Sequence, residues 1–147
     1  MPARWITIPA DDGQSFEGYL SVPESGSGPG LVLIQEIFGV NSSIRGACDY
    51  FAGEGFVTLA PDLFWRFEPR LDIPFDEEGR KKAFALHTEY DNELGVGDIG
   101  HTLAALKAQS ECQGPVGVTG FCMGGTFAYL AATRLGVDMA AGYYGTK

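Results

Sequence analysis

The stretch that decides the fold is Gly120–Gly125, which reads GFCMGG. An apolar run, PVGVTGF at 115–121, leads into it, and MGGTFAYLAATRLG at 123–136 follows. The run is typical of a strand buried on both faces, and the second segment is typical of a helix that ends at Gly136. The sequence therefore predicts a strand that turns at once into a helix, with Cys122 at the turn.

Glycines stand two residues before Cys122 and two and three residues after it. Because glycine has no Cβ atom, the turn can be tight and can expose the thiol at the carboxyl end of the sheet. The helix N-terminus favours a thiolate there, and its free N–H groups can bind an oxyanion. We predict that Cys122 is a nucleophile and that the Met123 N–H is one oxyanion donor. The alternative is a buried, unreactive cysteine beside glycines that only allow close packing.

A second apolar run, LVLIQEIFG at 31–39, carries the carboxylate Glu36 near its end. In a fold with this type of turn, the loop after an early strand supplies the second oxyanion N–H, which here belongs to Ile37. Glu36 would lie at the same edge of the sheet and contact the thiol or its base. The alternative is a loop carboxylate that caps a helix.

Strands and helices alternate along the rest of the chain. RWITIPA and SFEGYLSVP, at 4–10 and 15–23, predict an N-terminal antiparallel hairpin around DDGQ. This order predicts one α/β domain over residues 1–147, with a mostly parallel sheet flanked by helices. The remaining predicted elements are strands at 56–62 and 139–145, helices at 41–55, 80–90 and 96–110 with ELGVG as the break between the last two, and a long connection at 63–79.

Composition excludes several classes of partner and site. The net charge of -9 makes nucleic acid and anionic membranes poor partners, and no apolar run approaches the ~20 residues of a membrane span. Three cysteines without zinc-site spacing suit a reducing cytoplasm, so we expect no disulfide framework, no metal and no cofactor. The N-terminus lacks the apolar core of a secretory signal, which also favours a cytoplasmic protein.

Five motifs, QEIFGVN, APDLF, GVGDI, GFCMGG and AGYYG, resemble the dienelactone hydrolase family of the α/β-hydrolase superfamily in their order and spacing. Members of this family are cytoplasmic enzymes that open lactones with a Cys nucleophile and Asp and His partners. The resemblance covers essentially the whole chain but only about the N-terminal two thirds of a member. It implies an α/β-hydrolase-like fold that lacks the C-terminal strands and helices.

The resemblance also assigns site residues by position. Cys122 corresponds to the nucleophile, and Glu36 to the carboxylate that accompanies the thiol in the resting enzyme. Ile37 and Met123 correspond to the two oxyanion amides. The sequence therefore yields the same four residues from the motif chemistry and from the resemblance.

Substrate contacts follow from the resemblance in the same way, at Arg80, Phe38 and Phe84. A guanidinium suits a carboxylate, so Arg80 indicates a small anionic lactone or ester, although a solvated helix residue is the alternative. Phe84 stands where the family has Tyr, and His87 where it has Trp. The natural substrate is therefore left open.

The acid and base of the triad are not in the expected place. In this superfamily they follow the nucleophile, but no histidine follows Cys122 and the only later carboxylate, Asp138, precedes the last predicted strand. His87 and His101 come earlier, on predicted helices. Because loss of triad members costs on the order of 10⁴ to 10⁶ in turnover, efficient hydrolysis is not expected unless the site is completed.

The strand predicted at 139–145 would be an exposed edge that can pair with another polypeptide. An alternative function is therefore a catalytically incompetent binding or assembly module, including a homo-oligomer formed through this edge. A third hypothesis is a redox or thioester protein that uses Cys122 alone.

Overall fold

The computed structural model describes residues 2–146. Within this range, one six-stranded sheet runs in the order β1-β2-β4-β3-β5-β6, with β1 and β2 as the predicted hairpin. β2 and β4 are also antiparallel, whereas β4, β3, β5 and β6 are parallel to one another, so the predicted mixed α/β fold is confirmed. The strands are β1 (Ala3–Pro9), β2 (Ser15–Ser21), β3 (Gly28–Ile34), β4 (Val57–Pro61), β5 (Cys112–Phe121) and β6 (Met139–Tyr143). The helices are α1 (Ser42–Gly53), α2 (Glu77–Glu89), α3 (Asn92–Lys107) and α4 (Met123–Arg134), with a short 3-10 turn at Asp11–Gly13.

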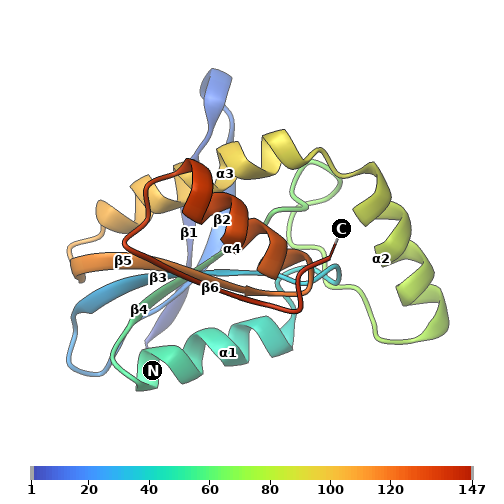
Figure 1. Cartoon of the computed structure of the whole chain (residues 1–147). Coiled ribbons are helices and arrows are strands. Elements are labelled where there is room, and N and C mark those ends of the chain that lie inside the picture. The colour runs from blue at the N-terminus through green and yellow to red at the C-terminus, as the bar shows by residue number, and fades with distance from the viewer. Residues whose placement is uncertain (1, 147) are drawn as a thin grey trace.

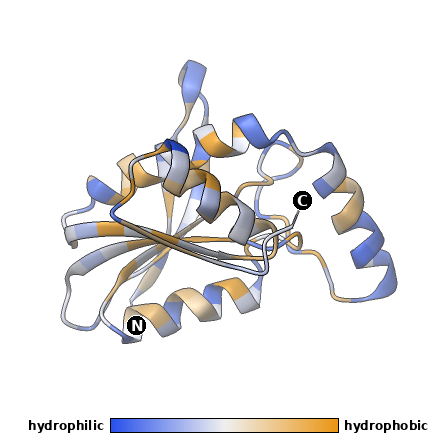
Figure 2. Ribbon diagram, viewed as in Figure 1, coloured by the Kyte–Doolittle hydropathy of each residue, from blue (hydrophilic) through white to orange (hydrophobic). Residues whose placement is uncertain are grey.

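Helices cover both faces of the sheet. α3 and α4 lie on one face and α1 on the other, while α2 stands beside the end of the sheet (Figure 1). The larger part of the core fills the space under α3 and α4, and a smaller cluster around Leu33 and Ile44 lies under α1. Hydrophobic residues run through the central strands, whereas the tip of the β1–β2 hairpin is hydrophilic (Figure 2). Within residues 2–146, no helix is both long and apolar enough to cross a membrane.

The strand that carries the QEIFG motif is shorter than its apolar pattern predicts. β3 ends at Ile34, and the next residues form a turn in which Glu36 is bridged to Gly39. Gly39 has φ 88°, which glycine adopts without strain. Glu36 and Ile37 therefore lie on a turn beyond the end of the sheet, where their backbone can serve a site.

The break between α2 and α3 lies at Tyr90–Asp91 and not at the predicted ELGVG segment. The Asp91 side chain caps α3, because its Oδ1 accepts hydrogen bonds from the backbone N–H groups of Glu93 (2.9 Å) and Leu94 (3.3 Å). ELGVG thus falls inside α3. The capping aspartate, rather than the glycines, determines where the helix begins.

β6 is an edge of the sheet, as the sequence predicts. Each of its residues is exposed, and Met139 retains 73 % of its accessible surface. Beside the strand lies a mainly apolar hollow of ≈ 350 Å³, whose lining includes Phe51, Phe56 and Met139. Among the described residues, no strand pairs with the outer side of β6.

Candidate active site

Cys122 occupies the turn between β5 and α4 in a backbone conformation that is rare for a residue with a side chain. Its φ is 58° and its ψ is -120°, outside the regions that L-residues favour. The Cys122 N–H donates to the Tyr143 carbonyl on β6 (3.0 Å), and the Cys122 carbonyl accepts from the Gly125 N–H (2.9 Å). These two bonds fix the strained backbone, which leaves the side chain only half-buried.

The glycines around Cys122 are required by close backbone contacts. A Cβ atom on Gly120 would collide with the Gly124 backbone, and one on Gly125 would collide with the Tyr143 carbonyl. On Gly124 a Cβ atom would collide with the Ile34 carbonyl and lie 2.7 Å from the Gln35 carbonyl oxygen. The first turn of α4 therefore lies directly against β6 on one side and against the end of β3 on the other.

Two backbone N–H groups at this junction have no partner among residues 2–146. Met123 is the first residue of α4, where an N–H has no intrahelical acceptor, and Ile37 lies in the turn after β3. Neither N–H donates to a protein acceptor within the described range. Both are available to bind an oxygen atom of a ligand.

Glu36, Cys122 and Tyr144 share one neighbourhood. Burial raises the pKa of Glu36 above its ordinary value. Burial also raises the pKa of Tyr144, and the nearby Glu36 and Cys122 raise it further. Since electrostatic effects of this kind act only over short distances, Glu36 and Cys122 each lie near the Tyr144 hydroxyl.

Tyr144 is a site residue that the sequence analysis missed. It follows β6 directly, and its neighbour Tyr143 stacks on Phe121 with ring centroids 5.2 Å apart. The signal that could have found it is its place at the carboxyl end of a parallel strand. β3, β5 and β6 all end at the same edge of the sheet, so residues that follow them meet there.

The turn at Glu36–Gly39 is also held from the side of the long connection. Gly39 is bridged to Asp72, and the Ile73 N–H donates to the Phe38 carbonyl (3.0 Å). Phe38 packs edge-to-face on Phe75 with ring centroids 4.6 Å apart. The connection therefore forms one wall of the region beside Glu36.

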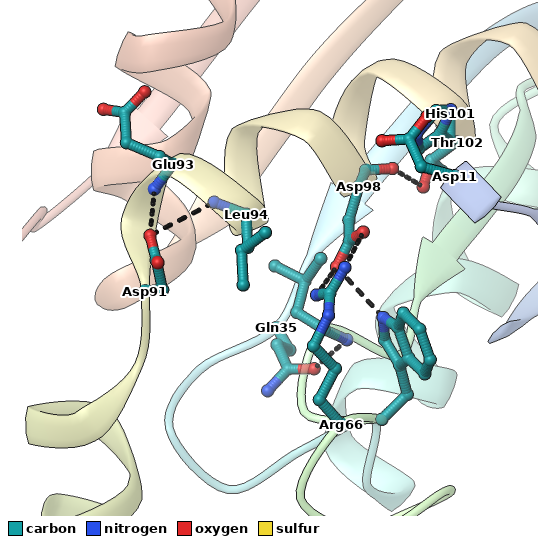
Figure 3. A network of polar contacts seen from close by, with 11 residues as sticks. Asp11, Gln35, Arg66, Asp91, Glu93, Leu94, Asp98, His101 and Thr102 are labelled. Atoms are coloured by element: carbon teal, nitrogen blue, oxygen red, sulfur yellow. Dashed lines mark hydrogen bonds and ion pairs between the residues drawn. The ribbon is translucent and has the colours of Figure 1, made fainter. Parts of the chain in front are cut away.

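A buried ion pair ties this connection to α3. Asp98, in the GVGDI motif, is 1 % exposed and accepts two hydrogen bonds from the Arg66 guanidinium, at 2.7 and 3.0 Å (Figure 3). The indole N–H of Trp65 donates a third bond to the same carboxylate (3.0 Å). A buried carboxylate is tolerated when it is paired and hydrogen-bonded in this way. Asp98 therefore has a structural part in the fold and does not point to catalysis.

Arg80 and Phe84 lie on α2, which begins at the cap that the Asp76 side chain forms with the Gly79 N–H (2.7 Å). The Arg80 side chain is exposed and makes no hydrogen bond or ion pair with another residue of the described range, and Phe84 is 59 % exposed. Figure 1 places α2 beside the end of the sheet at which the turn after β3 and the C-terminal residues lie. The helix that carries Arg80 and Phe84 thus stands beside this end of the sheet, and no hydrogen bond or ion pair within the described range joins either side chain to Cys122.

None of the remaining titratable candidates is bonded to Cys122 in the described part of the chain. His101 on α3 faces Asp11 on the hairpin, with Nε2 3.4 Å from the carboxylate. The Asp138 carboxylate accepts a hydrogen bond from the Val116 N–H (2.8 Å). Asp138 precedes β6, whereas Cys122 follows the parallel strand β5, so the two residues lie at opposite ends of these strands. His87 lies on α2, and no described residue hydrogen-bonds to its buried Nδ1. Within residues 2–146, no cluster of three or more His, Cys, Asp or Glu side chains could hold a metal ion.

Comparison with known proteins places this geometry in a family. The model of the dienelactone hydrolase family matches residues 16–147. A carboxymethylenebutenolidase of Pseudomonas sp. (strain P51) is 40 % identical over 146 residues, which are 99 % of this chain and 61 % of that protein. A carboxymethylenebutenolidase of Pseudomonas putida is 37 % identical, with 99 % and 62 % covered.

Solved structures agree with this match. The crystal structure of a putative dienelactone hydrolase from Klebsiella pneumoniae subsp. pneumoniae MGH 78578 has a TM-score of 0.81 and 28 % identity, and the match covers 99 % of this chain and 60 % of that one. The dienelactone hydrolase-like promiscuous phosphotriesterase P91 from metagenomic libraries has a TM-score of 0.68 and 26 % identity, with 95 % and 57 % covered. The chain spans about three fifths of the length of these two curated relatives.

Proposed function

Because the chain belongs to the dienelactone hydrolase family, we propose that it acts on carboxylic esters or lactones through a nucleophilic Cys122. The observation that carries the proposal is the strained backbone of Cys122 at the start of α4. Strain of this kind persists where the surrounding structure holds it, and it accumulates at functional sites. Here it occurs at a thiol on a helix N-terminus, and we take the N–H groups of Ile37 and Met123, which have no acceptor among residues 2–146, as the oxyanion donors.

The reaction begins with attack of the Cys122 sulfur on the carbonyl carbon. A carbon–sulfur bond forms, and the carbonyl oxygen becomes an oxyanion that the N–H groups of Ile37 and Met123 stabilise. When this intermediate collapses, the alcohol oxygen leaves and a thioester remains on Cys122. Glu36 takes the thiol proton and passes it to the departing alcohol oxygen, a task for which burial suits it, because its raised pKa makes the carboxylate a stronger base.

Hydrolysis of the thioester needs a base that activates water. Neither His87 nor His101 is hydrogen-bonded to Cys122 among the described residues, and Asp138 lies at the far edge of the sheet. We therefore infer that acylation of Cys122 is faster than its hydrolysis in these 147 residues. The acid and base of the complete triad would have to come from elements beyond those described.

The proposed substrate contacts are Arg80, Phe38 and Phe84. Arg80 has no acidic partner in the described range, so its guanidinium can bind a carboxylate of the substrate with two parallel hydrogen bonds. The exposed ring of Phe84 and the half-buried ring of Phe38 offer apolar contacts on either side. The substrate class is accordingly a small anionic lactone or ester.

Replacement of Arg80 by glutamine should separate anionic from neutral esters. We expect R80Q to slow acylation by mono-p-nitrophenyl glutarate roughly tenfold or more, because it loses a charge-assisted contact, and to leave acylation by p-nitrophenyl butyrate within about twofold. The measurement is the release of p-nitrophenolate in a single turnover, with Cys122→Ala as the blank.

The matched control for R80Q is Lys81→Gln on the same helix. Lys81 is exposed and lies 3.6 Å from Glu77, so its replacement removes an equal charge without touching the site. If K81Q and R80Q slow the anionic ester equally, general surface charge explains the preference and Arg80 is not a substrate residue.

A second candidate function is assembly through the β6 edge. The observation that favours it is that every residue of β6 is exposed and that its outer N–H and C=O groups have no partner strand in the described range. An exposed apolar edge is a template for pairing with another chain. A second copy of this chain is the simplest partner of this kind.

Replacement of Met139 by lysine should weaken such pairing, since a charge on an edge strand opposes association. We expect sedimentation velocity to show self-association of the unmodified chain and a monomer for M139K. Tyr50→Lys, on exposed residue Tyr50 of α1, is the control and should leave the association unchanged. A monomeric unmodified chain would rule out assembly of copies through β6.

A further inference from the structure

Gln35 is a buried polar residue whose side chain bonds to the Glu36 turn at one end and to Leu63, after β4, at the other. Its side chain is fully buried, at 0 % exposure, between the end of β3 and the residues that follow β4. Its Oε1 accepts a hydrogen bond from the Leu63 N–H (3.0 Å) (Figure 3). Its Nε2 donates to the Glu36 carbonyl (3.1 Å). A buried amide is costly unless such bonds are made, so both contacts constrain it.

The orientation of the Gln35 amide follows from its partners. The Leu63 N–H can only donate, so the amide atom that it faces must be the oxygen. The other end is then the NH₂ group, which faces the Glu36 carbonyl. Because Leu63 follows β4, and β3 and β4 are neighbouring parallel strands, the amide is anchored to the sheet itself.

Fixing the Glu36 carbonyl also fixes the next N–H. A trans peptide is planar, so the Glu36 C=O and the Ile37 N–H point in opposite directions. The Ile37 N–H has no acceptor among the described residues. The same segment lies against the first turn of α4, where a Cβ on Gly124 would be 2.7 Å from the Gln35 carbonyl oxygen.

We propose that Gln35 is a positioning residue that holds the Glu36–Ile37 peptide so that the Ile37 N–H can receive the oxyanion formed when Cys122 is acylated. This inference rests on the proposed function, because it concerns the same thioester-forming step. Without the Gln35 amide, the Glu36 carbonyl loses this donor, the peptide can rotate more readily, and its carbonyl rather than its N–H can then face the reacting oxygen. Gln35 itself contacts neither the thiol nor the substrate in this account.

Two reactions of Cys122 distinguish loss of the oxyanion donor from a general loss of thiol reactivity. Acylation by p-nitrophenyl acetate passes through an oxyanion: the carbon–sulfur bond forms, p-nitrophenolate leaves, and S-acetylcysteine remains. Alkylation by iodoacetamide displaces iodide from a CH₂ carbon and forms no oxyanion. Both need the thiolate, so the ratio of their rates reports the oxyanion donors and not the thiolate fraction.

The experiment measures both rates at Cys122 by peptide mass spectrometry, with the half-buried Cys112 as an internal reference thiol. Loss of one oxyanion donor costs on the order of 10² to 10³ in rate, and we expect Gln35→Met to lower the acylation-to-alkylation ratio roughly tenfold or more. Thr102→Val is the matched control. It removes another buried hydrogen bond, from Thr102 to the Asp98 carbonyl (2.7 Å), and should leave the ratio unchanged.

Gln35→Glu adds a pH dependence of the acylation-to-alkylation ratio, which would not be expected if Gln35 had only a structural role. Its carboxylate can still accept from Leu63 but cannot donate to the Glu36 carbonyl, whereas the protonated carboxyl can. We expect the acylation-to-alkylation ratio of Gln35→Glu to be low at neutral pH and to recover as the pH falls. At each pH this ratio is divided by that of the unmodified chain, so that titration of Glu36 itself cancels. This variant also allows the proposal to be tested if Gln35→Met does not fold.

The outcomes distinguish two failures. If Cys122 of the unmodified chain is acylated no faster than Cys112, the proposed function is wrong. If Cys122 is acylated faster, but Gln35→Met and Gln35→Glu keep the ratio of the unmodified chain at every pH, the positioning role of Gln35 is wrong.

Discussion

Replacement of Gly120 by alanine is expected to destabilise the protein by about 3 kcal/mol or more and to abolish selective reaction at Cys122. The new Cβ atom would collide with the Gly124 backbone, whose Cα would be 2.8 Å away. Gly124 cannot move aside, because it already lies against the carbonyls of Ile34 and Gln35. Backbone on both sides leaves no flexible side chain to absorb the clash, so the turn itself must open.

Urea unfolding followed by circular dichroism measures this effect, and Gly97→Ala is its control. Gly97 lies in α3 with no atom within 4 Å of an added Cβ, so alanine should stabilise the helix by about 0.5–1 kcal/mol. A Gly120→Ala protein that unfolds at the same urea concentration as the unmodified chain would show that the tight turn around Cys122 does not exist in solution.

The turn at Cys122 could be predicted because its signals are local and agree. An apolar run, a thiol between glycines and a helix-forming segment follow one another without interruption, and the strand, turn and helix form where the sequence predicts them. The Gly120 and Gly124 contacts confirm the reason for the glycines. Local consistency of this kind is what allows a sequence to specify a structure.

Other features depend on contacts between distant segments and could not be predicted in this way. The apolar pattern of β3 continues through Ile37, but the bond from Leu63 to the Gln35 side chain spans 28 residues and turns the chain after Ile34. The sequence carries two signals for the start of α3, the glycines of ELGVG and the capping residue Asp91, and the helix begins at the Asp91 cap. Tyr144 enters the site only because β6 ends beside β5.

The second large effect concerns the thiol itself. We expect the unmodified chain to release p-nitrophenolate from p-nitrophenyl acetate in a burst and then to turn over slowly. On the proposed mechanism, the burst reflects acylation of Cys122 at its strained turn, with the N–H groups of Ile37 and Met123 as the proposed oxyanion donors. The slow phase reflects hydrolysis without a histidine bonded to the thiol among residues 2–146. Loss of triad function costs on the order of 10⁴ or more in turnover, so the two phases should be well separated.

Burst kinetics combined with peptide mass spectrometry therefore tests the central claim, that Cys122 is the nucleophile. We predict a burst of about one p-nitrophenolate per chain, with the acetyl group on the Cys122 peptide and no burst from Cys122→Ala. A burst of equal size from Cys122→Ala, or an acetyl group that resides on Cys112 instead, would contradict the account.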